Sequence, residues 1–124
     1  MAAKIKTFKD LETWKEGHKL VLMVYKITKL FPKEERYGLA DQMRRCVVSI
    51  TSNLAEGFSR RGSKEKIQFY YTSKGSLTEL YNQLIIAKDV NYINNEVFDE
   101  IEDQVNKVGR LLTGLIRSVK TYEK

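Results

Sequence analysis

Cysteine, proline and histidine are almost missing from this 124-residue sequence, which has one of each. A single cysteine cannot close an intrachain disulfide, so the fold must be held together by its core. The only proline, Pro32, marks the expected end of a helix, because the residue before proline avoids helical geometry. The only histidine, His18, has Lys15 three residues before it, so the Glu-x-x-His pattern of metal sites in helical bundles is missing. We therefore expect no metal site and no cofactor.

Long apolar runs and catalytic signatures are missing as well. No segment approaches the roughly 20 apolar residues that span a membrane, and the N-terminus MAAKIKTFKD lacks the apolar core of a signal peptide. Together with the low cysteine content, these features predict a cytoplasmic protein without a membrane partner. The sequence has no glycine motif for phosphate and no nucleophile elbow, so we expect that the protein is not an enzyme.

Helical periodicity dominates what the sequence does contain. Apolar residues recur every three or four positions in four segments, and no segment alternates as a strand would. The predicted helices run from about Asp10 to Leu30, over 37–61, from Ser63 onward, and from Asn94 or Asn95 onward. Asp10, Ser63 and one of the two asparagines are suitable N-caps. Four helices joined by short loops predict an all-α fold, an antiparallel up-down-up-down four-helix bundle that forms a single domain over 1–124.

The same spacing predicts which side of each helix faces the core. In the first helix these positions are Leu11, Trp14, His18, Val21, Tyr25 and Thr28. In the fourth they are Phe98, Ile101, Val105, Val108, Leu112, Leu115, Val119 and Tyr122. Cys46 lies on the apolar face of the second helix and is expected to be a small buried residue. Gly75 lies inside the third helix, where glycine is unfavourable, so we expect another backbone to approach it closely.

The second helix, 37–61, carries two ordered faces. Its apolar face is Leu39, Met43, Cys46, Val47, Ile50, Leu54 and Phe58. Its polar face, also at steps of three and four, is Gln42, Arg45, Ser49, Asn53, Glu56 and Arg60. We call the first five of these polar residues the polar seam. Two interpretations stay open: a face exposed to solvent, or a row of hydrogen-bonding groups against a neighbouring helix or a second subunit.

The positive charge is the feature that suggests a ligand. The net charge is +6, and residues 1–62 carry most of it, whereas residues 93–124 have a net charge of −1. We therefore expect any basic field on the first half of the chain. The candidate nucleic-acid-binding residues are Arg44, Arg45, Arg60, Arg61, Lys64 and Lys66. Guanidinium groups bind phosphate, and the aromatic run at 69–71 could stack on bases; the alternative is a solvated loop.

Three long motifs resemble a known family. They are FKDLETWKEGHKLVLMVYKITKLFP at 8–32, YGLADQMRRCVVSITSNLAEG at 37–57 and FYYTSKGSLTEL at 69–80. The chain resembles the bacterial four-helix-bundle proteins encoded in intervening sequences of 23S rRNA genes, which are related to the accessory bundle proteins of diversity-generating retroelements. Family members often have proline after the Ser-Ile pair, where this chain has Thr51, so a possible kink is removed.

The resemblance implies an antiparallel bundle that assembles into a ring-shaped homo-oligomer, a pentamer, with a basic surface suited to nucleic acid and a protein partner. It makes the polar seam a candidate for structural or intersubunit hydrogen bonds. The leading hypothesis is thus a non-enzymatic, basic, homo-oligomeric bundle that binds RNA or other nucleic acid through phosphate contacts. The alternative is a protein–protein interaction scaffold or accessory subunit with a polypeptide partner.

Overall fold

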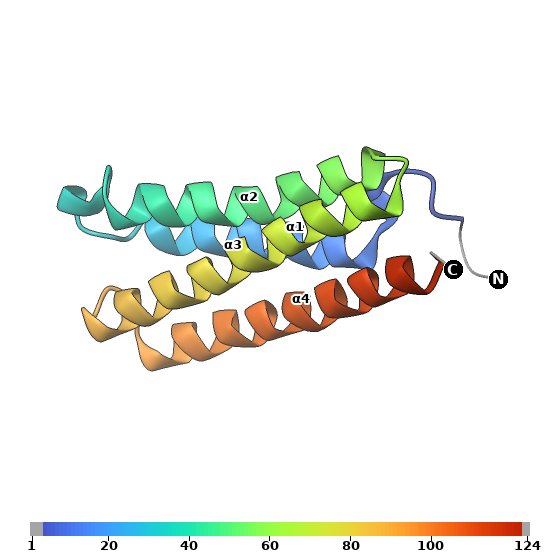
Figure 1. The fold of residues 1–124 in the computed structure, drawn as a ribbon. Helices are drawn as coiled ribbons and strands as arrows, with labels where there is room; N and C mark the ends of the chain where they lie inside the picture. The colour runs from blue at the N-terminus through green and yellow to red at the C-terminus, as the bar shows by residue number, and fades with distance from the viewer. Residues whose placement is uncertain (1–3, 123–124) are drawn as a thin grey trace.

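Four long helices make up the fold (Figure 1), which a computed structural model describes for residues 4–122. They are α1 (Glu12–Thr28), α2 (Leu39–Ser59), α3 (Ser63–Asp89) and α4 (Asn95–Tyr122), with short 3-10 turns η1 (Phe8–Asp10) and η2 (Lys33–Glu35). Successive helices run in opposite directions, and α1 and α3 each pack against both α2 and α4. The predicted antiparallel up-down-up-down bundle is confirmed, and residues 4–122 contain no strand.

Residues 1–3 and 123–124, which belong to the predicted domain, and the side chain of Tyr122 lie outside the described part of the chain. Within residues 4–122, no helix combines the length and the apolar composition that crossing a bilayer requires.

The first helix begins differently from the prediction. Asp10 does not cap α1, which starts at Glu12 after Leu11. Instead its carboxylate accepts hydrogen bonds from the backbone N–H groups of Lys6 at 2.9 Å and Thr7 at 3.0 Å. These bonds, that from Thr7 most, lower the pKa of Asp10. Asp10 therefore closes the preceding turn, because its side chain reaches backwards to donors that no helix uses.

Of the other two predicted helix caps, one is confirmed and one is wrong. Asn94 caps α4 as expected, since its Oδ1 accepts the backbone N–H of Val97 at 2.8 Å. Gly62, and not Ser63, occupies the N-cap position of α3, where no side chain accepts from the first turn. The boundary is thus displaced by one residue.

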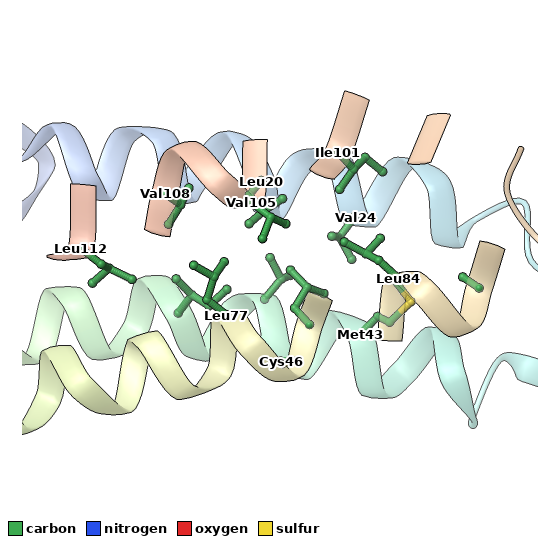
Figure 2. Packing of buried hydrophobic residues seen from close by; sticks show 14 of the residues in the cluster. Leu20, Val24, Met43, Cys46, Leu77, Leu84, Ile101, Val105, Val108 and Leu112 are labelled. Carbon is green, nitrogen blue, oxygen red and sulfur yellow. The ribbon is translucent and has the colours of Figure 1, made fainter. Parts of the chain in front are cut away.

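The core is one cluster of apolar side chains from all four helices. Figure 2 shows Leu20 and Val24 of α1 pointing toward Leu77 and Leu84 of α3 and toward the row on α4. The buried positions of α4 are Phe98, Ile101, Val105, Val108, Leu112 and Ile116. The predicted α4 face is confirmed over its first five members, while Ile116 takes the buried place expected for Leu115.

Leu11 and Thr28, at the two ends of the predicted buried face of the first helix, are buried as expected, but the middle of that face is rotated. His18 and Tyr25 are exposed, whereas Leu20 and Val24 are fully buried. The imidazole of His18 stacks on the indole of Trp14 at the surface, with ring centroids 4.9 Å apart. Two apolar rows run along this helix, and the one that contains the small residue Gly17 faces α2, because it permits the closer approach of the two helices.

The close approach expected at Gly75 occurs elsewhere. A Cβ built on Gly75 would meet no heavy atom within 4 Å, so that prediction was wrong. A Cβ on Gly57 would lie 2.7 Å from Cε1 of Tyr70 and 2.9 Å from Cβ of Phe69, so α2 and α3 are tightest at this end. Glycine there is required by packing, because any side chain would collide with α3.

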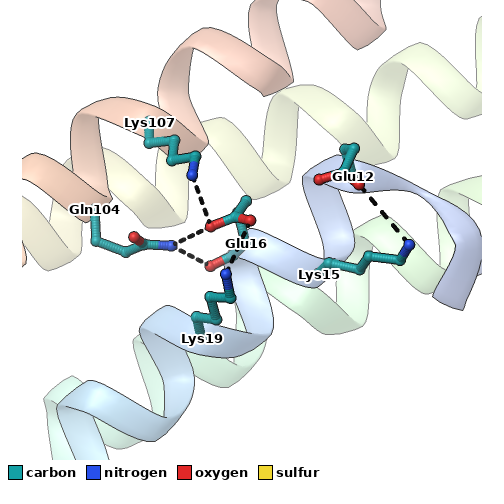
Figure 3. A network of polar contacts seen from close by, with 6 residues as sticks. All are labelled: Glu12, Lys15, Glu16, Lys19, Gln104 and Lys107. Atoms are coloured by element: carbon teal, nitrogen blue, oxygen red, sulfur yellow. Dashed lines mark hydrogen bonds and ion pairs between the residues drawn. The ribbon is translucent and has the colours of Figure 1, made fainter.

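A buried carboxylate ties α1 to α4 (Figure 3). Gln104 Nε2 donates to Glu16 Oε1 at 3.0 Å and to its backbone oxygen at 2.8 Å. Lys107 and Lys19 place their Nζ atoms 3.4 Å and 3.3 Å from the same carboxylate. The hydrogen bond from Gln104, followed by those from the two lysines, holds the pKa of Glu16 below its ordinary value although burial opposes this. The network fixes α4 against the bundle and so sets the position of the groove described below.

Candidate nucleic-acid interface

Two cations of the α2–α3 loop are engaged within the chain. Arg60 places Nη2 3.0 Å from Glu56 and Nη1 3.8 Å from Glu65, and its guanidinium lies 4.9 Å from the ring centre of Phe69. Lys66 Nζ donates to the backbone oxygen of Phe58 at 2.7 Å. Burial lowers the pKa of Lys66. Lys66 thus caps the carbonyl groups at the C-terminal end of α2, and neither cation is fully available to a ligand.

The two mid-helix arginines are engaged as well. Arg44 Nε donates to the Thr28 hydroxyl at 2.8 Å, and its guanidinium lies 4.9 Å from the ring centre of Tyr25. Arg45 Nε lies 3.0 Å from the carboxylate of Asp41. Arg44 and Arg60 are also about 24 Å apart along α2, at 1.5 Å per residue. The six predicted cations therefore do not gather into one site.

Arg61 and Lys64 differ from the other four predicted residues. Both are exposed, and neither makes an ion pair with any carboxylate in residues 4–122. Of the predicted loop, these two side chains offer charge to a ligand.

The middle of the polar seam meets α3. Ser49 Oγ lies 2.9 Å from Ser76 Oγ, and Asn53 Nδ2 donates to the backbone oxygen of Ser49 at 2.8 Å. Gln42 is exposed, and Glu56 pairs with Arg60 instead of with α3. A shallow hollow of about 310 Å³ lies beside this contact and is lined by Gln42, Arg45, Cys46, Ser49, Ser76 and Glu79. The seam is thus a helix–helix contact at its centre and open surface at its ends.

Cys46 is not placed for reaction. Its Sγ donates to the backbone oxygen of Ser76 at 3.0 Å. Burial, followed by the charge of Glu79, raises the pKa of the Cys46 thiol to about 12. The thiolate that nucleophilic attack or metal binding needs is therefore not formed at neutral pH. In the described part of the chain no group of three or more histidine, cysteine or acidic side chains lies close enough to hold a metal ion.

A groove between α3 and α4 was overlooked by the sequence-based prediction. Its main part has a volume of about 580 Å³ and is lined by Lys74, Leu77, Thr78, Tyr81, Val105, Asn106, Gly109, Arg110, Thr113, Gly114 and Arg117. A second part of about 190 Å³ shares Lys74, Thr113 and Arg117 and adds Tyr71, Ile116 and Lys120. Three lining residues are common to both parts, so the two hollows lie side by side between α3 and α4, and we call them together the α3–α4 groove.

Four cations surround the α3–α4 groove: Lys74 from α3, and Arg110, Arg117 and Lys120 from α4. No acidic residue lines it, and none of these four side chains pairs with a carboxylate within residues 4–122. Within the described residues, no ion pair therefore offsets their charge, although Lys120 also contacts Tyr71. The charges come from two different helices, so the fold gathers what the sequence separates.

Two tyrosines mark the ends of the groove. Lys120 Nζ donates to the Tyr71 hydroxyl at 2.9 Å and lies 5.3 Å from its ring centre. This hydrogen bond, with the charge of Lys120, lowers the pKa of Tyr71. At the other end the Tyr81 hydroxyl donates to Glu102 Oε2 at 2.6 Å, which raises the pKa of Tyr81 and fixes its ring.

The floor of the groove is apolar, and two of its lining residues are glycines. Leu77 and Val105 are buried below it. A Cβ on Gly114 would meet no heavy atom within 4 Å, and one on Gly109 would touch Leu77 Cδ2 at 3.5 Å. These glycines leave space that larger residues would fill.

The spacing of the groove residues carried a signal that could have been found. Tyr71, Lys74, Thr78 and Tyr81 follow steps of three, four and three on α3, and Asn106, Arg110, Thr113, Arg117 and Lys120 follow steps of four, three, four and three on α4. Each row runs beside a core face. Segment charge concealed them, because the acids at the start of α4 cancel the bases that follow.

Both the sequence and the fold match known proteins. A sequence model of the family described as 23S rRNA-intervening sequence protein matches residues 9–114. The crystal structure of a protein of unknown function from the S23 ribosomal protein family of Bacteroides thetaiotaomicron has a TM-score of 0.79 and 17% identity, over 85% of this chain and 95% of that one. At this identity the likeness shows the fold alone. The comparison with curated proteins gives no match.

Proposed function

The chain belongs to the 23S rRNA-intervening sequence protein family, and we propose that it is a non-enzymatic, homo-oligomeric bundle that binds nucleic acid through phosphate contacts in the α3–α4 groove. The description of this family and the family name of the structural neighbour refer to ribosomal RNA and to a ribosomal protein, respectively. They support RNA as the first nucleic acid to test.

The observation that carries the proposal is the set of four cations around the α3–α4 groove, which have no carboxylate partner within residues 4–122. A cation that is already paired with a carboxylate attracts a further anion less strongly than an unpaired cation does. Arg110 and Arg117 can each bind a phosphate through two parallel hydrogen bonds, and Lys74 and Lys120 act as point charges. Threonine and asparagine side chains between them add neutral donors.

A second candidate is a protein-interaction scaffold, and exposed apolar side chains favour it. Leu30 is 83% exposed, Tyr37 86% and Leu22 57%. Such residues are common at protein–protein contacts when they form a patch. We propose that they take part in self-association, for which the family resemblance suggests a pentameric ring, or in contact with a polypeptide partner.

The experiment is a titration of a fluorescent structured RNA at about 50 mM and about 200 mM salt. Four phosphate contacts to single-stranded segments predict a slope near −3 in log affinity against log salt, or about 50-fold weaker binding at the higher concentration. The Lys74→Gln/Arg117→Gln variant should bind at least about tenfold more weakly and lose about half of that slope.

Two matched variants remove the same charge elsewhere. Lys26→Gln/Lys29→Gln changes exposed lysines at the end of α1 and should bind as wild type does. Arg61→Gln/Lys64→Gln tests the loop cations and should weaken RNA binding less than Lys74→Gln/Arg117→Gln does. Equal losses in all three variants would show only general attraction, and no binding by wild type would overturn the proposal. Light scattering of each sample, compared with the 14.5 kDa chain, tests the oligomer.

A further inference from the structure

We infer that the α3–α4 groove selects single-stranded nucleic acid, with unstacked bases inside the groove against Tyr71 and Tyr81 and the phosphates on its four cations. The inference rests on the proposed function and specifies its ligand. The experiment below distinguishes a groove that binds nucleic acid without selecting a single strand from a groove that binds no nucleic acid.

The groove has two surfaces of different chemistry. Lys74, Arg110 and Arg117 supply positive charge at its sides, while Leu77 and Val105 form an apolar floor. A ligand that uses both surfaces must carry anionic groups and flat apolar groups at short intervals. An unpaired nucleotide does so, whereas a duplex encloses the faces of its bases and offers mainly phosphate and sugar.

The tyrosines supply the stacking surfaces that such a ligand needs. Tyr71 is 47% exposed. Tyr81 is half-buried, and its hydroxyl bond to Glu102 holds the ring in one orientation. The two residues are about 15 Å apart along α3, so at most about four nucleotides lie between them at the 3.4 Å rise of a stacked strand, and fewer when the bases are unstacked. Aromatic rings beside a cationic track are the usual arrangement of proteins that bind single strands.

The glycines of α4 keep the groove open. A Cβ at Gly114 would enter empty space, so no contact in the described part of the chain requires glycine at this position. Glycine is nevertheless unfavourable in a helix interior. Gly114 lines the groove, unlike Gly75, so its missing side chain leaves space there that a base could occupy and a larger residue would fill.

Acidic polypeptide is the other polyanion that could meet the four cations. It would pair with Lys74 and Arg117 through carboxylates, but it would leave the exposed ring of Tyr71 without a stacking partner. The tyrosines and the apolar floor therefore favour the nucleic acid strand, and an acidic polypeptide becomes one outcome of the test.

The experiment fills the groove without changing its charge. Gly114→Leu places a side chain in the groove, and Gly75→Leu is its control, because Gly75 also faces open space but lies outside the groove. Each variant is titrated with a labelled single-stranded RNA and with the duplex of the same sequence, and its folding is checked by thermal melting.

We expect wild type to bind the single strand at least tenfold more tightly than the duplex. Gly114→Leu should weaken single-strand binding about tenfold and leave duplex binding unchanged, and Gly75→Leu should change neither. Tyr71→Ala should also weaken single-strand binding about tenfold, in the range measured for loss of one stacked base. Tyr71→Phe, which keeps the ring, should retain it, so the tyrosine pair decides the question if Gly114→Leu fails to fold.

Equal binding of single strand and duplex, lost in Lys74→Gln/Arg117→Gln but not in Gly114→Leu, would overturn the inference and leave the proposed function intact. Binding of neither nucleic acid would overturn both. A poly-glutamate chain that binds the groove as tightly as the single strand would assign it to acidic polypeptides and also overturn the inference.

Discussion

The α2–α3 loop and the α3–α4 groove have the same number of cationic side chains but differ in how many of these are engaged by other groups of the chain. The loop region has Arg60, Arg61, Lys64 and Lys66, and the groove has Lys74, Arg110, Arg117 and Lys120. In the loop, Arg60 is held by two carboxylates and Lys66 by backbone carbonyls. In the groove, within residues 4–122, no carboxylate pairs with any of the four.

The difference follows from distance along the chain. Arg60 is four residues after Glu56 and five before Glu65, so local geometry alone pairs it. Lys66 lies one turn into α3, within reach of the free carbonyls that end α2. The groove cations instead come from two helices, and the nearest acid on their facing rows, Glu102, bonds to Tyr81 and not to a cation. Two of the four loop cations are thus engaged by groups close to them in sequence, whereas no carboxylate within residues 4–122 pairs with a groove cation.

The largest expected effect separates the glycines of the two regions. Gly57→Ala should lower the free energy of unfolding by about 2 kcal/mol, because its Cβ would collide with Tyr70 and with Cβ of Phe69. Gly114→Ala should raise it by up to about 1 kcal/mol, since the helix gains a better former in open space. Urea unfolding with unchanged slope measures both. Equal changes of the same sign in the two variants would mean that packing at Gly57 is no tighter than at Gly114.

A smaller effect separates the lysines. Lys66→Met should cost about 1 to 2 kcal/mol of stability, because the carbonyls at the end of α2 lose their donor, and should leave RNA affinity nearly unchanged. Lys74→Met should leave stability within about 0.5 kcal/mol and weaken RNA binding. Denaturation and binding curves of the two variants test this reciprocal pattern. If Lys66→Met weakens binding more than Lys74→Met does, the comparison between the regions fails.

The sequence predicts the buried face of a helix correctly where that helix has a single apolar row. On α4 a single apolar row runs from Phe98 to Leu112, and its burial was predicted correctly. On α1 two rows compete, and the choice falls on the one with Leu20 and Val24 because Gly17 allows α2 to approach there. Periodicity identifies the apolar rows of a helix, but it does not show which row lets a neighbouring helix approach closely. The rotation of α1 could therefore not be predicted from the sequence.

The candidate site was less predictable for a related reason. Arg61 and Lys64 were predicted, and both are exposed. The groove was not predicted, since a net charge of −1 over residues 93–124 conceals the separation of acids near Glu102 from bases beyond Arg110. Pairing Lys74 with Arg117 requires knowing that α3 and α4 are neighbours. Charge must be counted along helix faces, and only after the neighbours of each helix are known.

The smallest expected effect is spectroscopic and concerns the end of the groove. The hydrogen bond and charge of Lys120 hold the pKa of Tyr71 below its ordinary value. The ionised form is thus favoured in the folded state, so its contribution to stability is present above the unfolded pKa and is lost as the pH falls through the folded pKa. The titration of Tyr71 therefore reports its contact with Lys120.

The absorbance of tyrosinate, taken as the difference between wild type and Tyr71→Phe, isolates this one residue among seven tyrosines. Lys120→Met should raise the pKa of Tyr71. A saturating single-stranded RNA should raise it as well, because a phosphate that draws Lys120 away removes the donor and adds negative charge nearby. The control is Lys66→Met, which should leave the titration unchanged. A Tyr71 pKa that does not respond to RNA would place the bound strand away from Lys120 and remove the groove's advantage over the loop.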